Sequence, residues 1–110
     1  SYSSNYIALS SPNGGDFCIN NKTIDINWIS NGISNVNIDY STDNGSTWNS
    51  AATNISASSG LYNWNVSATP SDNCLIKISE TGNSSLNDMS KNVFTISAPL
   101  TAVEPLIPNT

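Results

Sequence analysis

The chain has 110 residues, enough for one compact domain and too few for two. It carries 3 basic and 8 acidic side chains, a net charge of −5, so nucleic acid and anionic membranes are not expected partners. It contains no His, which removes the usual general base and the commonest zinc ligand, and no apolar run is long enough to span a bilayer.

Along the chain, apolar residues alternate with polar ones, and no helical period competes with this pattern. Residues 1–5 precede the first alternation and are predicted to be a linker. Period-two alternation is typical of strands with one buried face. Groups of Gly, Pro, Asn, Asp and Ser that favour turns lie between the alternating segments. These segments are residues 6–9, 23–28, 35–40, 61–66, 74–79 and 93–96.

The alternation assigns side chains to an inner and an outer face. Predicted inward are Ile24, Ile26, Trp28, Val36, Ile38, Tyr40, Trp48, Tyr62, Trp64, Val66, Cys74, Ile76, Ile78, Phe94 and Ile96. Predicted outward are Asp25, Asn27, Asn35, Asn37, Asp39, Asn63, Asn65 and Lys77. About seven short, half-buried strands predict an all-β fold, an antiparallel β-sandwich over residues 6–97. Residues 98–110 break the alternation with three prolines and are predicted to be a second linker.

The stretch STDNGSTW, residues 41–48, has a spacing that invites a functional interpretation. Local turn chemistry explains it more simply. Asp43 can accept hydrogen bonds from backbone amides of the turn, and Gly45 can supply a positive φ. Trp48 is expected to fold back onto the core. We therefore predict a structural hairpin turn made by Asp43, Gly45 and Trp48 rather than a ligand site.

Several motifs together resemble a known family. They are Ser11–Asp16 (SPNGGD), Ile26-x-Trp28, the Tyr40-STDNGSTW stretch, Gly60-x-Tyr62-x-Trp64-x-Val66, Cys74–Ser79 (CLIKIS) and Phe94-Thr95-Ile96. This series resembles the immunoglobulin-like, or fibronectin III-like, modules that are repeated in large secreted bacterial proteins. It is also distantly similar to the N-terminal domain of yeast cell-wall proteins of the Kre/Knh type. STDNGSTW by itself is similar to the Asp-box of sialidase propellers, but it occurs once here, in a chain too short for a propeller.

Cys18 and Cys74 suit either one disulfide or two free thiols. In an immunoglobulin-like order, the strand that begins near Cys74 runs antiparallel to the strand of residues 35–40. Its start then lies at the same end of the sandwich as Cys18, which precedes the strand of residues 23–28. On this basis we predict a disulfide between the two cysteines.

Residues suited to catalysis or metal binding are sparse. The carboxylates are scattered over turns and outward strand positions, where a raised pKa is not expected for Asp25 or Asp39. No Ser lies in a nucleophile elbow, and no spacing matches a calcium loop. We predict no catalytic residues, no metal and no cofactor. Five Asn-x-Ser/Thr triplets are present, as chance predicts in so Asn- and Ser-rich a chain.

Carbohydrate is the ligand class that remains open. Sugar platforms need aromatic rings on the surface, and only Tyr2, Tyr6 and Phe17 are left over from the inward set. The sequence therefore disfavours a flat platform, leaves a site at a loop end open, and identifies no ligand-binding residue.

The resemblance implies a non-catalytic accessory module of a secreted or cell-surface bacterial multidomain protein. Its expected partners are a polysaccharide or cell-surface glycan and the neighbouring domains of the same chain, and the module is expected to be a monomer. The alternative is a structural spacer with no ligand of its own.

Overall fold

The structure is a computed structural model and describes residues 5–99. The predicted linkers at residues 1–5 and 98–110 therefore lie almost wholly outside the described residues. Within the described range the chain forms strands and one short 3-10 turn, η1. In order these are β1 (Tyr6–Ser11), β2 (Phe17–Ile19), β3 (Thr23–Asn31), β4 (Asn35–Ser41), β5 (Asn49–Ser56), η1 (Ala57–Ser59), β6 (Leu61–Asn65), β7 (Ser71–Glu80), β8 (Asn83–Met89) and β9 (Phe94–Ser97).

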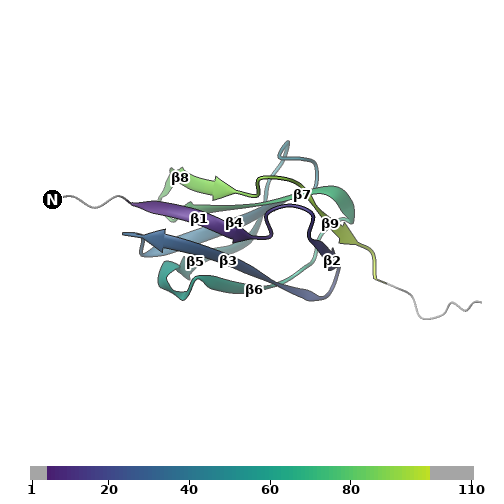
Figure 1. The fold of residues 1–110 in the computed structure, drawn as a ribbon, viewed down its shortest axis with the longest axis horizontal. Coiled ribbons are helices and arrows are strands. Elements are labelled where there is room, and N and C mark those ends of the chain that lie inside the picture. The colour runs from purple at the N-terminus through teal and green to yellow at the C-terminus, as the bar shows by residue number, and fades with distance from the viewer. Residues whose placement is uncertain (1–4, 100–110) are drawn as a thin grey trace, which may run out of the picture.

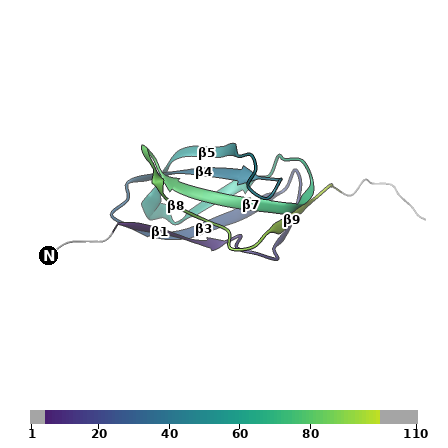
Figure 2. The ribbon, with the colours of Figure 1, turned by 90° about the horizontal axis from the view of Figure 1, so that it is seen from above.

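The strands build two sheets that pack face to face (Figures 1 and 2). The smaller sheet has the order β1-β3-β6, and the larger has the order β2-β9-β7-β4-β5, with β8 also paired to β7. All neighbouring strands are antiparallel except β2 and β9, which run parallel. The prediction of an all-β sandwich is confirmed. Residues 5–99 contain nine strands rather than about seven, because β2, β5 and β8 are added to the six segments that the alternation marked.

The core lies between the sheets and is filled mainly by the predicted inward residues of β3, β4, β6, β7 and β9. In β3, Ile26 and Trp28 are buried while Asp25 is exposed. In β7, Cys74, Ile76 and Ile78 are buried on the same alternate positions. Burial of these side chains is the main favourable term for folding in a chain with so few charges.

Opposite sides of the sandwich are closed by different contacts. On one side β8 lies beside β1, and the backbone N–H of Leu9 donates to Oδ2 of Asp88 at 2.7 Å. On the other side the chain passes from β5 to β6 through η1, where the indole Nε1 of Trp28 donates to the carbonyl of Ala57 at 3.0 Å. These contacts fix the spacing of the sheets at both sides.

Candidate functional site

The STDNGSTW stretch forms the turn between β4 and β5, and its polar groups bond to one another. Oδ1 of Asp43 accepts from the backbone N–H of Thr47 at 2.9 Å, and Oδ2 accepts from the Thr47 hydroxyl at 2.6 Å. The buried hydroxyl of Ser41 donates to Oδ1 of Asp43 at 2.7 Å. Gly45 has a φ of 90°, in the left-handed region that favours glycine. Both carboxylate oxygens are thus occupied within the turn, which is the arrangement of a structural element.

These hydrogen bonds lower the pKa of Asp43 from its ordinary 3.8 to about 2, with the bond from the Thr47 side chain as the largest cause. A carboxyl whose pKa is lower when folded stabilises the fold fully above its ordinary pKa, and the contribution disappears as the pH falls toward the folded value. We therefore expect Asp43→Asn to lower the melting temperature at pH 6. At pH 2 the two proteins should melt nearly alike. Equal differences at both pH values, measured by circular dichroism, would contradict this origin.

Trp48 does not fold onto the core as predicted. Its ring lies under Nζ of Lys77, 4.4 Å from the ring centroid, and Lys77 is on the outer face of β7. Leu75, also on that outer face, is nevertheless buried. Trp48 and Leu75 both lie beside Gly45. Because Trp48 precedes β5 and belongs to the turn, the period-two rule did not apply to it, and the ring packs on the outside of the larger sheet.

The predicted disulfide is also wrong, since both cysteines are free and buried. Cys18 is within strand β2 rather than in a turn, opposite Ile96 of β9, while Cys74 is opposite Phe94 on the other side of β9. Strand β9 thus separates them. Strands two apart in a sheet lie roughly 10 Å from each other, whereas a disulfide needs Cα atoms within about 7 Å. The strand order assumed from the sequence placed both cysteines at the same end of the sandwich, but it did not predict that β9 lies between them.

The free thiols are unsuited to nucleophilic or metal chemistry. The Cys18 thiol donates to the carbonyl of Thr95 at 3.5 Å, and the Cys74 thiol to the carbonyl of Ser71 at 3.3 Å. Burial is the main cause that raises the pKa of Cys18 to about 11, and burial also raises the pKa of Cys74. Both are therefore protonated near neutral pH and act as small apolar core groups.

Among the carboxylates, Asp39 differs from the expectation because burial raises its pKa, with Lys77 acting in the opposite direction. Lys77 lies directly across from it on β7. No group of three or more His, Cys, Asp or Glu side chains that could hold a metal gathers within residues 5–99. Asp39 therefore stands with a Lys partner rather than in a cluster suited to acid–base or metal chemistry.

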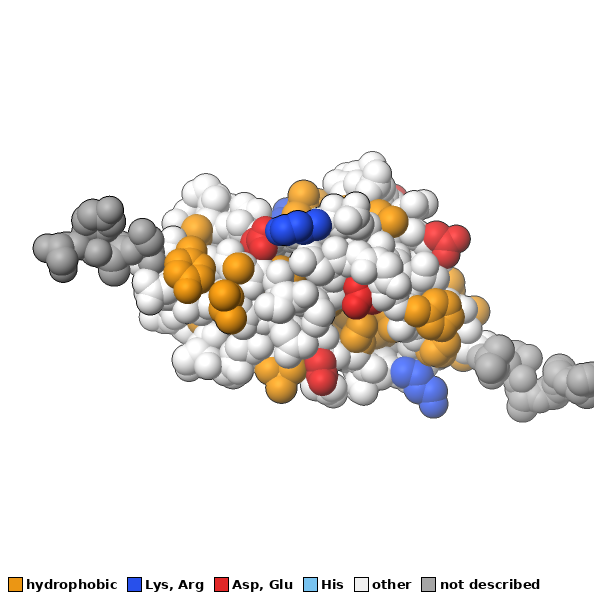
Figure 3. Space-filling model, in the orientation of Figure 1, with side chains coloured by type: hydrophobic (Ala, Val, Ile, Leu, Met, Phe, Trp, Pro, Cys, Tyr) orange, Lys and Arg blue, Asp and Glu red, His pale blue; other side chains and the backbone are white. Residues whose placement is uncertain are grey.

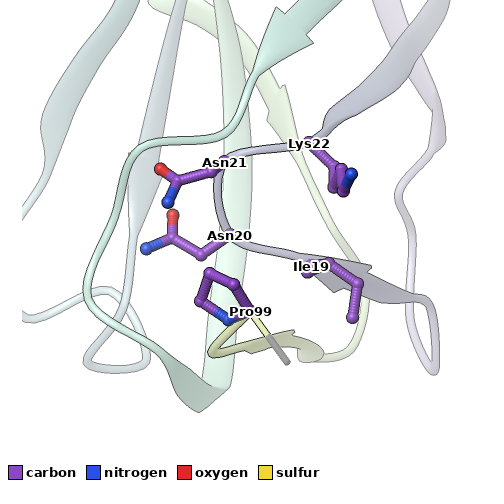
Figure 4. Close-up of a pocket in the computed structure, with 5 residues that line it drawn as sticks. All are labelled: Ile19, Asn20, Asn21, Lys22 and Pro99. Carbon is purple, nitrogen blue, oxygen red and sulfur yellow. The ribbon is translucent and has the colours of Figure 1, made fainter. Parts of the chain in front are cut away.

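A pocket of about 460 Å³ lies at the β2–β3 turn. It is lined by Ile19, Asn20, Asn21, Lys22 and Pro99. Figure 4 shows the amides of Asn20 and Asn21 on one side of the turn beside the Pro99 ring, whereas the Lys22 side chain points to the other side. No carboxylate lines the pocket. Amides next to an apolar ring suit a neutral group that has both hydroxyls and C–H faces.

The pocket is held in place by backbone hydrogen bonds to two strands. The N–H of Asn20 donates to the carbonyl of Ser97 at the end of β9, and the N–H of Asn21 donates to the carbonyl of Val66 just after β6, both at 2.8 Å. Oδ1 of Asn20 accepts from the N–H of Ala68 at 3.0 Å, which fixes that amide and directs its Nδ2 donor away from this bond. The turn backbone and the Asn20 side chain are thus preorganised for a ligand.

Of the aromatic residues left over from the core, Phe17 is 64% exposed on β2, two residues before Ile19 of the pocket wall. Tyr6 is 44% exposed at the start of β1, at the opposite end of the molecule, and Tyr2 lies outside the described residues (Figure 1). The sequence left a site at a loop end open but could not locate the pocket, because Pro99 joins it from a distant part of the chain.

Comparison with protein-family models, with curated proteins and with solved structures finds no match to this chain. Within residues 5–99 the structure has no helix with the length and apolar character needed to cross a membrane.

Proposed function

We propose that this chain is an immunoglobulin-like accessory module of a secreted bacterial multidomain protein and that it attaches the protein to carbohydrate. The strand order supports the immunoglobulin-like assignment. The first, third and sixth strands form one sheet, and the sheet opposite contains the antiparallel β4–β7 pair that such an order requires.

The pocket at the β2–β3 turn is the observation that carries the binding role. Sugars are recognised by amides that both donate and accept, together with an apolar ring against the C–H face of the pyranose. The two asparagines and Pro99 supply this combination on a rigid turn. Exposed Phe17, next to the pocket wall, extends the apolar surface available to a second sugar unit.

Titration calorimetry against a panel of soluble oligosaccharides tests this proposal. Asn20→Asp keeps the acceptor for Ala68 but removes the Nδ2 donor, and Asn21→Gly removes an amide while tolerating its φ of 72°. Either change should weaken binding about tenfold, the value of one hydrogen bond. Asn54→Gly is the matched control, since Asn54 is exposed at a φ of 59° away from the pocket. Equal losses in the control would contradict the assignment of the site.

The alternative, a spacer without a ligand, is favoured by the way outward polar groups bond to one another. Nδ2 of Asn63 donates to Asp25 at 2.8 Å, and Oδ1 of Asn37 accepts from both Asn54 and Thr81. Side chains already paired offer less to a ligand. An absence of binding across a broad oligosaccharide panel would support the spacer role.

A further inference from the structure

Three of the large exposed apolar side chains of residues 5–99 lie on one surface, the outer face of β1-β3-β6. Tyr6 is 44% exposed, Ile29 58% and Leu61 46%. Ile29 lies across from Ala8, which is the outward residue of β1 that follows Tyr6. Leu61 lies across from Asn27, which is the outward residue of β3 next to Ile29. The three side chains therefore follow a diagonal across three neighbouring strands. We call this surface the β1-β3-β6 face.

Figure 3 looks onto this side of the molecule, and apolar atoms gather on it toward the end where β1 begins, mostly among uncharged polar atoms, with an acidic and a basic side chain along the upper edge. Single exposed apolar residues are ordinary on protein surfaces, whereas a group with a polar surround marks an interaction site. The inward side chains of the same strands, such as Leu9 and Trp28, are buried, so the exposed set is not a gap in the core.

The β1-β3-β6 face is almost free of charge. Among its outward positions in the described strands, Asp25 is the one ionisable acid or base apart from the Tyr6 phenol, and its carboxylate accepts from Asn63. Nδ2 of Asn27 donates to the hydroxyl of Ser11 at 2.9 Å. A partner that fits this surface is uncharged and combines apolar patches with hydroxyls.

The dimensions of the β1-β3-β6 face bear on whether its partner is a protein or a thinner ligand. The nine residues of β3 span about 30 Å and three strands span about 15 Å, so the face covers roughly 450 Å². A stable protein–protein interface needs about 800 Å² on each partner. This flat area is smaller than the surface such an interface uses, and the face is long enough for an extended polymer only a few ångströms thick.

We propose that the β1-β3-β6 face binds a single extended chain of a neutral polysaccharide. The Tyr6 ring stacks on the C–H face of one sugar unit, and Ile29 and Leu61 contact the following units along the diagonal. Among the described residues of this face, Tyr6 carries the one exposed ring, which suits a single chain and not the flat surface of a crystalline polysaccharide. This inference rests on the proposed attachment role. It adds a second binding surface, for a polymer chain, to the pocket, which binds short sugars.

Affinity electrophoresis of the full chain tests the proposal, with hydroxyethylcellulose and galactomannan as neutral polymers and polygalacturonate as an anionic one. The neutral polymers should retard the protein, and retardation should be unchanged from 50 to 500 mM salt because no charges are involved. The triple variant Tyr6→Ala, Ile29→Thr, Leu61→Thr should weaken the apparent affinity at least tenfold, because it removes the ring and both apolar contacts. The threonines retain strand propensity, so the fold should be kept. Met89→Thr, at a residue 42% exposed on the larger sheet, should bind like the unsubstituted chain.

Any of these results would overturn the proposal: no retardation in either neutral polymer, retardation in polygalacturonate alone, an equal loss in Met89→Thr, or a dimer in sedimentation equilibrium that the triple variant dissociates. If the face variants leave polymer binding intact while Asn20→Asp abolishes oligosaccharide binding, this inference fails and the attachment role stands. If neither set of variants changes any binding, both fail.

Discussion

Replacing Ser90 with Ala is expected to lower the free energy of unfolding by about 3 kcal/mol, which would lower the melting temperature of a domain of this size by roughly 15 °C. The Ser90 hydroxyl donates to the carbonyl of Pro12 at 2.7 Å and accepts from the backbone N–H of Ile76 at 3.0 Å. All of these groups are buried. Alanine would leave one buried donor and one buried acceptor without their partner, and each such group costs about 1–3 kcal/mol.

The effect is large because Ser90 joins three segments that are distant in sequence. It follows β8, contacts β7 through Ile76, and holds the connection that carries the chain from β1 in one sheet to β2 in the other. Ser85→Ala is the control. Its hydroxyl is exposed and bonds only locally to Asn83, so the change should alter stability by less than about 0.5 kcal/mol. Chemical denaturation measures both variants, and similar values for the two would mean that water replaces the Ser90 hydroxyl.

The parts of the fold that the sequence predicts are those in which one face of a strand is strongly apolar. Ile24, Ile26 and Trp28 alternate with polar residues, and side-chain direction in a strand follows from that pattern alone. Strand β8 (NSSLNDM) lacks such a pattern. Of its inward side chains, Leu86 is apolar and packs against the core, whereas Asp88 bonds to the backbone of β1. A polar residue that faces inward to bond a neighbouring strand carries no signal in hydrophobic periodicity.

The predictions that were wrong have a related cause, because they concern residues whose positions depend on contacts between distant segments. Trp48 packs on Lys77, which is 29 positions further along the chain. The separation of Cys18 and Cys74 depends on β9 entering between β2 and β7. The pocket likewise joins the β2–β3 turn to Pro99. Local propensity specifies strands and turns, whereas strand order and register decide which of them meet.

Trp28→Ala is expected to have the largest effect of any substitution considered, a loss of about 4 kcal/mol, as is usual for a buried Trp. The Trp28 side chain is only 3% exposed and lies at the centre of the smaller sheet. Its backbone also anchors the crossing from β5 to β6, since its N–H donates to the carbonyl of Gly60 at 3.1 Å. Gly60 has a φ of 63°, and a Cβ there would approach the Trp28 carbonyl to 3.1 Å, so this crossing accommodates little change.

The more informative variant is Trp28→Phe, which keeps an aromatic ring but removes the indole N–H that donates to Ala57. The Ala57 carbonyl also accepts from the N–H of Gly60, so it would not be left without a partner. We therefore expect a loss of about 2 kcal/mol, from one hydrogen bond and a small cavity.

Trp64→Phe is the matched control. Trp64 is 4% exposed, and its indole packs against the Tyr40 ring. The control should lose about 1 kcal/mol less, because only the cavity term remains. Equal losses in the two variants, measured by urea denaturation, would show that Trp28 stabilises the crossing through its volume and not through its bond to Ala57.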